Sequence, residues 1–424
     1  MLISMKRAGV LTFAFFACAL LSACGGSNLS TNNNDSDTTV YYSQSLAFRN
    51  MTTLMSWGYN GYGQLGDGTT TNQSAPEQVH TGAERYSGIS VGSNHVLAFM
   101  NNSTVRAWGY NAYGQLGSSA SSFGTSTLPV AVAGVHGTKA VAAGHNFSLA
   151  LANYSSATHV IAWGRDDRGQ LGNNSTIDSP SPVPVRMTGS ALLPGDITQL
   201  VVGSDHCLAL QSNGTVWTWG SDTYGQLGDS DLTLHDPTVG GTRAYAMPVV
   251  GITGTVTAVA AGGSTSYALT SDGTIWAWGY NGFGQLAVDP AAVPYRTTPQ
   301  QIMLIGTTPL SGVKAIGAGL AHLVALMNDG TVMSVGGNMF GQMGTGVLAD
   351  QQARTNLYFT APQQALSSAG TPLTGVASLE LVTGNHTIVR MNGGSLLAWG
   401  SNLYGQLGNG TTDIVTYPVA VTGF

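Results

Sequence analysis

Short apolar segments separated by turn-forming residues run along nearly the whole chain after residue 40. Residues 96–99 form one such segment, which follows Gly92, Ser93 and Asn94, and residues 418–421 form another, which follows a polar loop. Short runs of this kind, bounded by Gly, Asn, Asp and Ser, are typical of β-strands joined by tight turns. The pattern predicts an all-β chain in which each repeating unit contributes about four antiparallel strands.

One phrase marks the units: Trp-Gly, four variable residues, then Gly-Gln-Leu-Gly. Successive copies begin 51, 55, 56, 59, 57 and 64 residues apart, and in most copies a His stands thirteen residues earlier, as His95 does before Trp108. A period of this size is a whole supersecondary unit, and a small four-stranded sheet needs neighbours to bury both of its faces. Seven such sheets closed in a ring give a seven-bladed β-propeller of four-stranded antiparallel blades. The seven openings are Trp57, Trp108, Trp163, Trp219, Trp278, Val335 and Trp399.

The repeat resembles that of the regulator of chromosome condensation family, whose copies carry Trp-Gly, Asn, Gly-Gln-Leu-Gly and an upstream Gly-x-x-His-Ser-Leu-Ala-Leu. The resemblance covers roughly residues 40–424, with departures at Val335 for Trp, Met343 for Leu and Ala287 for the last Gly. We interpret these departures as blades that are present but whose repeat sequence has diverged, and call such copies worn. The resemblance implies a seven-bladed propeller, but no single shared activity, because function on a common fold lies in particular surface sites.

The first two dozen residues predict export. Lys6 and Arg7 precede an apolar run at residues 8–21, and Leu-Ser-Ala-Cys ends at Cys24. A basic end, a short apolar core and small residues before a cleavage site are typical of a signal peptide. The ending resembles the bacterial lipoprotein box, which implies lipid attachment at Cys24. Gly25, and no Asp, follows Cys24, so the outer membrane or the cell surface is expected rather than the inner membrane. The expected division is 1–23 signal peptide, 24–38 flexible tether and 39–424 propeller.

Charge narrows the classes of partner. Only 8% of the residues are charged, and without Lys6 and Arg7 there remain 12 basic against 20 acidic residues, a difference of −8. Nucleic-acid binding favours clustered Lys and Arg, so we expect no nucleic-acid partner. If the signal is removed and Cys24 carries lipid, Cys207 is the one thiol left, and packing and ring closure must stabilise the chain.

The repeated polar residues predict structure rather than chemistry. A Trp at one place in every blade is expected to fill the space between neighbouring sheets. The recurring His is expected to be structural, because each His lies in a different blade and cannot share a metal ion with the others. A Gln that recurs in every copy is expected to satisfy backbone groups of its turn. These glutamines are Gln64, Gln115, Gln170, Gln226, Gln285, Gln342 and Gln406.

Sequence motifs for catalysis or ligand binding lack their proper context. Ser90 lies in a Gly-x-Ser-x-Gly sequence, the pattern of a nucleophile elbow, but it occupies a strand position of the repeat. The glycines at 61, 63 and 66 match the Gly-x-Gly-x-x-Gly pattern of dinucleotide-binding proteins. They belong to the repeat phrase, however, and the sequence around them predicts no βαβ unit. We therefore expect no catalytic residue, no cofactor and no metal. An acidic group is interpreted as solvated loop rather than a calcium loop: Asp205, Asp222, Asp229, Asp231 and Asp236.

A candidate binding patch comes from a position that varies between blades. Tyr59, Tyr110 and Arg165 each stand two residues after the repeat Trp in three consecutive copies. Tyr and Arg dominate protein interfaces, although such residues also serve as ordinary loop tips that cover neighbouring blades.

The leading hypothesis is a lipid-anchored, non-enzymatic, monomeric propeller at the cell envelope that binds a protein or a glycan. One alternative is an extracytoplasmic polysaccharide-acting hydrolase or lyase on a propeller face, which needs two convergent carboxylates. A guanine-nucleotide exchange factor is implied by family analogy alone and conflicts with export. A purely structural surface protein is a third alternative, suggested by low charge and abundant small polar residues.

Overall fold

Consecutive antiparallel pairing turns each repeat into one sheet. The computed structural model describes residues 44–49, 53–80, 85–118, 124–230, 241–350 and 357–424. The chain divides into the units Met1–Tyr41 and Tyr42–Phe424, and every described residue belongs to the second unit. In the described part no helix is long and apolar enough to cross a membrane.

Seven sheets follow one another along the chain. The strands of the first four sheets are β1 (Gln44–Phe48), β2 (Leu54–Gly58) and β3 (Gln73–Gln78); β4 (Tyr86–Val91), β5 (His95–Met100), β6 (Val105–Tyr110) and β7 (Thr125–Ala131); β8 (Ala140–Ala143), β9 (Phe147–Tyr154), β10 (Ala157–Gly164) and β11 (Ser179–Pro184); β12 (Ile197–Val202), β13 (His206–Gln211), β14 (Val216–Ser221) and β15 (Thr242–Pro248). Those of the last three are β16 (Val256–Gly262), β17 (Thr265–Thr270), β18 (Ile275–Tyr280) and β19 (Tyr295–Gln301); β22 (Val313–Ala318), β23 (His322–Met327), β24 (Val332–Gly337) and β25 (Tyr358–Gln364); β28 (Val376–Thr383), β29 (His386–Met391), β30 (Leu396–Gly400) and β31 (Val415–Ala420).

Three small elements lie outside these sheets. They are the hairpins β20 (Met303–Ile305) with β21 (Thr308–Pro309) and β26 (Leu366–Ser368) with β27 (Thr371–Pro372), and the 3-10 turn η1 (Thr188–Ser190). Each hairpin follows the outermost strand of a blade and leads to the first strand of the next.

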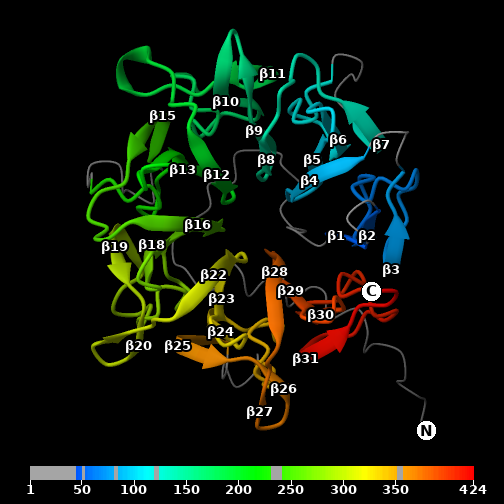
Figure 1. Ribbon diagram of the computed structural model, residues 1–424, viewed down its shortest axis with the longest axis vertical. Coiled ribbons are helices and arrows are strands. Elements are labelled where there is room, and N and C mark those ends of the chain that lie inside the picture. Colours follow the sequence, from blue (N-terminus) through cyan, green and yellow to red (C-terminus); the bar gives the residue numbers. More distant parts are fainter. Residues whose placement is uncertain (1–43, 50–52, 81–84, 119–123, 231–240, 351–356) are drawn as a thin grey trace, which may run out of the picture. The chain divides into compact units, whose positions relative to one another are not determined.

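The sheets of the described unit stand as blades around a ring (Figure 1). The first strand of each sheet from β4 onward lies toward the centre, and the last strand lies on the outside. The prediction of a seven-bladed β-propeller is confirmed, and six sheets have four strands. The first sheet has three strands in the described part. Gln44 on β1 pairs with Gly58 as His95 on β5 pairs with Gly109, so β1 corresponds to the second strand of the other blades.

Pairing of the second and third strands explains why Gly follows the Trp. In the second blade His95 pairs with Gly109 and Val96 pairs with Trp108. Gly109 has φ +102°, and a Cβ there would lie 2.8 Å from the Cα of His95, so a side chain is excluded on both counts. The pairing of β6 with β7 shifts register around Trp108. Such a bulge bends the strand locally.

The apolar cores lie between neighbouring sheets rather than inside one sheet. One core cluster joins Leu46 and Leu54 of the first blade to Val96 and Trp108 of the second. Another joins residues of the last blade to Met55 and Trp57 of the first, among them Ile388 and Leu407. Each sheet therefore depends on both of its neighbours, across the join between the chain's last and first blades as elsewhere.

Candidate functional site

Aromatic residues gather where the third strand of a blade passes into the loop that leads to the fourth. Tyr110 ends β6, and its N–H donates to the carbonyl of Asn94 in the turn between the first two strands, at 2.8 Å. Arg165 makes the matching bond to Asn146 at 3.0 Å. Because both turns stand at the same end of each blade, their side chains share one face of the ring.

Four tyrosines on this face are in consecutive contact across three blades. The ring centroids of Tyr404 and Tyr59 are 5.0 Å apart, those of Tyr59 and Tyr62 are 6.2 Å apart, and those of Tyr62 and Tyr110 are 4.8 Å apart. The guanidinium of Arg165 lies 5.4 Å from the ring centroid of Tyr113. We call Tyr404, Tyr59, Tyr62, Tyr110, Tyr113 and Arg165 the aromatic belt; all six side chains are half-buried.

The contacts of the three predicted patch residues run through residues that were not predicted. Tyr59 and Tyr110 are joined by Tyr62, and Arg165 packs on Tyr113. The missed residues stand five after the repeat Trp. An aromatic side chain at that position in six of the seven copies was the available signal: Tyr62, Tyr113, Tyr224, Phe283, Phe340 and Tyr404. Tyr224, Tyr280 and Phe283 form a second group, with centroid distances of 4.7 and 6.3 Å.

The repeated Gln fixes the backbone beneath each of these aromatic residues. The backbone N–H of Tyr62 donates to Oε1 of Gln64 at 2.8 Å, and the N–H of Tyr404 donates to Oε1 of Gln406 at 2.9 Å. The same bond occurs in all seven copies, at 2.7 to 3.0 Å. The aromatic side chains therefore project from a turn held by buried polar groups.

The backbone carbonyl of the same Gln links neighbouring blades. Trp108 donates its Nε1–H to the carbonyl of Gln64 at 2.9 Å, and Trp57 donates to that of Gln406 at 2.9 Å. All six repeat tryptophans are fully buried. The bond from each Trp reaches the preceding blade, and the distances are 2.8 to 3.0 Å.

Each of the four repeat histidines is buried and lies within hydrogen-bond distance of a hydroxyl of the following blade. His95 Nε2 lies 2.9 Å from Ser148 Oγ, and Ser148 donates to the carbonyl of Gln115. His206 pairs likewise with Ser266 at 2.9 Å. The remaining pairs are His322 with Thr387 at 3.3 Å and His386 with Ser45 at 2.7 Å.

The worn copy at Val335 is compensated by its neighbours. Without a Trp there, the carbonyl of Gln285 accepts instead from the hydroxyl of Tyr267, a buried residue of the preceding blade, at 3.2 Å. Tyr267, Val335 and Ala287 lie in one core cluster. In other blades a Cβ on the last Gly of the phrase would meet the next Trp, as at Gly228, where it would lie 2.7 Å from Trp278 Nε1. Ala287 is accommodated because Val335 leaves that space free.

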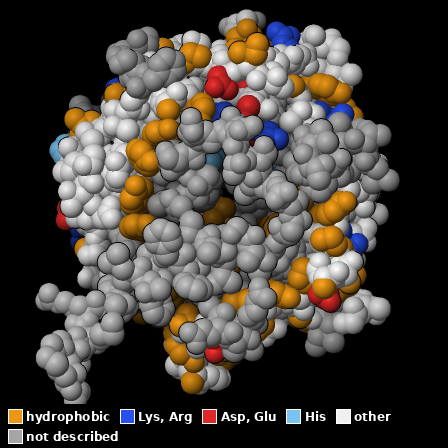
Figure 2. Space-filling model, turned by 180° about the vertical axis from the view of Figure 1, so that it is seen from behind, with side chains coloured by type: hydrophobic (Ala, Val, Ile, Leu, Met, Phe, Trp, Pro, Cys, Tyr) orange, Lys and Arg blue, Asp and Glu red, His pale blue; other side chains and the backbone are white. Residues whose placement is uncertain are grey.

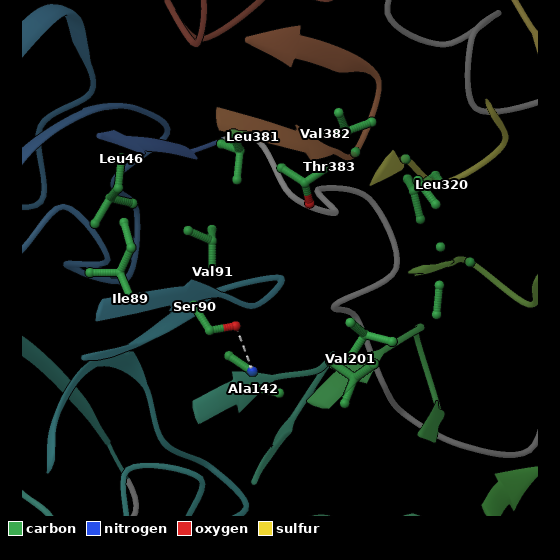
Figure 3. Close-up of a pocket in the computed structure, with 18 of the residues that line it drawn as sticks. Leu46, Ile89, Ser90, Val91, Ala142, Val201, Leu320, Leu381, Val382 and Thr383 are labelled. Carbon is green, nitrogen blue, oxygen red and sulfur yellow. Dashed lines mark hydrogen bonds between the residues drawn. The ribbon is translucent and has the colours of Figure 1, made fainter. Parts of the chain in front are cut away.

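A cavity of about 240 Å³ lies at the centre of the ring and is lined by residues of all seven blades (Figure 3). Most of the residues that line it have aliphatic side chains, such as Leu46, Val201 and Leu381, but polar groups form about half of its surface. Ser90 lies on β4 and accepts a hydrogen bond from the N–H of Ala143 at 3.0 Å, so its predicted strand position is confirmed. Glu380 is the one lining residue with a carboxylate.

Glu380 is not free for catalysis. Arg390 donates to both of its carboxylate oxygens, at 2.9 and 3.0 Å, and Ser378 donates to one of them at 3.0 Å. Glycoside hydrolysis commonly uses two opposed carboxyl groups. The cavity lining offers a single carboxylate already bound by an arginine, so it does not favour the hydrolase or lyase alternative.

The acidic residues considered for calcium do not form one site in the described chain. Asp229 forms a buried ion pair with Arg243, and Asp222 accepts from the N–H of Leu227 at 2.9 Å. Asp231 and Asp236 lie outside the described residues, as does Cys24. No group of three His, Cys, Asp or Glu side chains able to hold a metal is present among the residues described.

One buried carboxyl is unusual. Asp166 is fully buried, and burial is the main cause that raises its pKa to about 8. The charges of Asp178 and Asp167 raise this pKa further, whereas the hydrogen bond from Leu171 N–H lowers it. Such a group is held close to the balance between its acid and its ionised form at neutral pH.

Among the described residues visible from behind the view of Figure 1, hydrophobic side chains gather in an interrupted arc and charged side chains are sparse (Figure 2). Low charge and exposed apolar side chains are features of surfaces that bind by contact area rather than by electrostatic attraction.

Comparisons with known proteins agree with this architecture. The model of the RCC1-like domain matches residues 135–424, and models of the regulator of chromosome condensation (RCC1) repeat match residues 53–99, 104–151 and 86–115. The chain is similar to the ultraviolet-B receptor UVR8 of Arabidopsis thaliana, with 27% identity over 337 residues, covering 78% of this chain and 69% of the receptor. It is also 33% identical over 264 residues to the probable E3 ubiquitin-protein ligase HERC6 of Homo sapiens, covering 62% of this chain and 24% of that protein.

Solved structures share the fold. Human WBSCR16 has a TM-score of 0.70 at 21% identity, covering 88% of this chain and 94% of the other. Prp20p from Saccharomyces cerevisiae has a TM-score of 0.69 at 23% identity, covering 91% of this chain and 88% of the other. At these identities the likeness concerns the fold alone.

Proposed function

Because the chain belongs to the regulator of chromosome condensation (RCC1) repeat family, we propose that it is a non-enzymatic binding propeller, tethered by lipid at Cys24 in the cell envelope, whose aromatic belt binds a protein. The observation that carries the proposal is the unbroken contact from Tyr404 through Tyr59 and Tyr62 to Tyr110. Large aromatic side chains on a fixed backbone supply contact area at low entropic cost.

The contacts within the belt also favour binding over mere coverage of the neighbouring blades. Each ring is held by another ring in a tilted or edge-on geometry, which stabilises it in one orientation. Arg165 is held over Tyr113 and paired with Asp167 at 2.8 Å. A surface of tyrosines ending in an arginine has the composition of an interface hot spot.

The envelope location rests on the sequence. Lys6 and Arg7, the apolar run at residues 8–21 and the Leu-Ser-Ala-Cys ending support a lipoprotein signal. The low basic content supports a partner other than nucleic acid. A tethered propeller needs no further membrane segment to act at the cell surface or in the periplasm.

Crosslinking and affinity capture from native membranes test this proposal. We expect Tyr59→Ala/Tyr110→Ala/Arg165→Ala to reduce the captured partner at least tenfold, since hot-spot residues each contribute roughly 2 kcal/mol. The matched control is Tyr224→Ala/Tyr280→Ala, which breaks a similar ring contact away from the belt. Cys24→Ala is expected to move the protein to the soluble fraction. Undiminished capture by the triple variant contradicts the binding face, and unchanged membrane retention of Cys24→Ala contradicts the anchor.

A further inference from the structure

One buried carboxylate oxygen in the third blade has no partner. Asp166 Oδ1 accepts from Leu171 N–H at 2.9 Å, whereas its Oδ2 is buried with no hydrogen-bond partner. Leaving an ionised oxygen in this state is costly, and native structures seldom do so without a compensating group. Five copies have Asn at the same repeat position: Asn60, Asn111, Asn281, Asn338 and Asn402.

The first blade shows what lies around this atom. There the Nδ2 amide of Asn60 donates to the carbonyls of Thr69 and Thr71, both at 3.1 Å, and to Asp67 Oδ1 at 3.2 Å. The amide thus points into a loop whose oxygens all accept hydrogen bonds. An ionised carboxylate in its place has no proton with which to satisfy them, so Asp166 needs either a bound proton or a bound cation at this position.

The third blade keeps the same loop frame. Asp166 N–H donates to Asp178 Oδ1 at 2.8 Å, as Asn60 N–H donates to Asn72 Oδ1 at 2.8 Å. Three further bonds also match. The Leu171 N–H donates to Asp166 Oδ1 as the Leu65 N–H donates to Asn60 Oδ1. The two loop bonds that follow are Ser175 N–H to Asn173 Oδ1 and Ile177 N–H to Ser175 Oγ in the third blade, and Thr69 N–H to Asp67 Oδ1 and Thr71 N–H to Thr69 Oγ1 in the first. By this correspondence Asp166 Oδ2 is expected to take the place of Asn60 Nδ2, on the side of the loop formed by residues 173–177.

Both amides of the first blade are carboxylates in the third. Asn60 and Asn72 correspond to Asp166 and Asp178, whereas Asp67 corresponds to Asn173, so the loop of the third blade has two carboxyl groups where that of the first has one. Arg165 and Arg168 do not balance them, because both lie toward Asp167, at 2.8 and 4.0 Å. Asp178 is exposed, which gives an ion access from solvent.

We propose that the third blade binds a divalent cation of the calcium type between Asp166, Asp178 and the oxygens of residues 173–177. Carboxylate, amide and carbonyl oxygens are the ligands that hard cations prefer, and Ca²⁺ tolerates irregular geometry. With two carboxylates and otherwise neutral ligands we expect a dissociation constant of about 10⁻⁴ to 10⁻³ M, in the range of extracellular modules. The cation would hold this loop, next to Arg165 of the aromatic belt, in place.

Calorimetric titration with CaCl2 and thermal unfolding test the site in the full-length protein, first stripped with chelator. We expect one Ca²⁺ per chain and a rise in Tm of about 1–3 °C at several times the dissociation constant. Asp166→Asn/Asp178→Asn restores the first blade's amides and should fold, while its Ca²⁺ affinity falls at least tenfold and its Tm no longer responds.

A reciprocal variant tests whether the two carboxylates are sufficient to bind Ca²⁺. Asn60→Asp/Asn72→Asp copies the two carboxylates into the first blade and should add a second Ca²⁺ equivalent. The proposal is overturned if the wild-type protein shows neither calorimetric heat nor a Tm response to Ca²⁺, or if Asp166→Asn/Asp178→Asn retains both. A wild-type Tm that varies with pH but not with Ca²⁺ also overturns it, because a proton then neutralises Asp166.

Discussion

At the residue scale, the pairing of His with a hydroxyl in the next blade follows a rule across the ring. Where the His position is His95, His206, His322 or His386, the facing residue is Ser or Thr. Where it is Gln44, Phe147 or Thr265, the residue at the facing position is apolar: Val96, Cys207 and Leu323. At this repeat position the chain therefore has a hydroxyl where the neighbouring blade offers an imidazole and an apolar side chain where it does not, so each buried imidazole has a partner for its Nε2.

These histidines predict acid sensitivity. Burial is the main cause that lowers the pKa of His95, His206 and His386 to about 3 and that of His322 to about 4. Below pH 6.5 these histidines are protonated in the unfolded chain but stay neutral in the folded chain. The free energy of unfolding therefore falls as the pH drops from 6.5 toward 3. Between pH 6.5 and 5 each His accounts for at most about 2 kcal/mol of the free energy of unfolding.

His95→Gln tests this effect, since Gln44 already occupies the position in the first blade and donates to Gly92 O at 2.8 Å. Urea unfolding at pH 7 and pH 5 should show a smaller loss of stability on acidification for His95→Gln than for the wild type. The exposed His80→Gln is the control. An equal loss in His95→Gln and the wild type contradicts the assignment.

At the element scale, each blade depends on the next one, whose Trp packs beside the last Gly of the repeat phrase. The last Gly of the phrase and the next blade's Trp occupy adjoining space, as Gly228 and Trp278 do. The sixth blade shows that the two positions change together, because Val335 accompanies Ala287 and the hydroxyl of Tyr267 serves the carbonyl left by the missing Trp.

A double-mutant cycle measures this coupling. Gly228→Ala should lower the free energy of unfolding by about 2 kcal/mol, because the Cβ would meet Trp278 and φ is +67°. In a Trp278→Val background the same change should cost less by at least about 1 kcal/mol. Denaturant midpoints give the four values. Strict additivity contradicts the proposed exchange of volume between blades.

At the scale of the whole ring, the join between the last and first blades uses the two kinds of bond found at interior interfaces, the Trp bond to a Gln carbonyl and the pair of His with a hydroxyl. Trp57 and Ser45 both donate to the carbonyl of Gln406, at 2.9 and 2.8 Å, and Ser45 also lies against His386. A ring closed in this way has no terminal blade, unlike an open stack of repeats, whose end units are the least supported.

Ring closure predicts that the join is as sensitive as any interior interface. Trp57→Leu and Trp278→Leu should each reduce the free energy of unfolding by about 2–4 kcal/mol, because each leaves a cavity and removes one of the two hydrogen bonds to a Gln carbonyl. Thermal unfolding of the two variants gives the comparison. A much smaller loss for Trp57→Leu contradicts a join that is energetically equivalent to the others.

The repeat phrase was enough to predict the ring, but only part of the candidate site. Tyr59, Tyr110 and Arg165 were predicted because they vary between copies, whereas Tyr62 and Tyr113, which connect them to their neighbours, stand at a position too uniform to attract notice. Asp166 was missed as well, since an Asp for Asn exchange in a loop has little meaning until the atoms facing it are known.

The sequence by itself determined the number of blades, the antiparallel strand pattern and the structural character of the repeated Trp, His and Gln, because periodicity and local turn chemistry are written along the chain. Tertiary structure alone decided which residues meet across blades, such as His95 with Ser148 and Tyr62 with Tyr110, and that Tyr267 serves the carbonyl of Gln285 within the fifth blade. The physical reason is that these contacts join residues far apart in sequence, and burial and geometry at the interface select the partner.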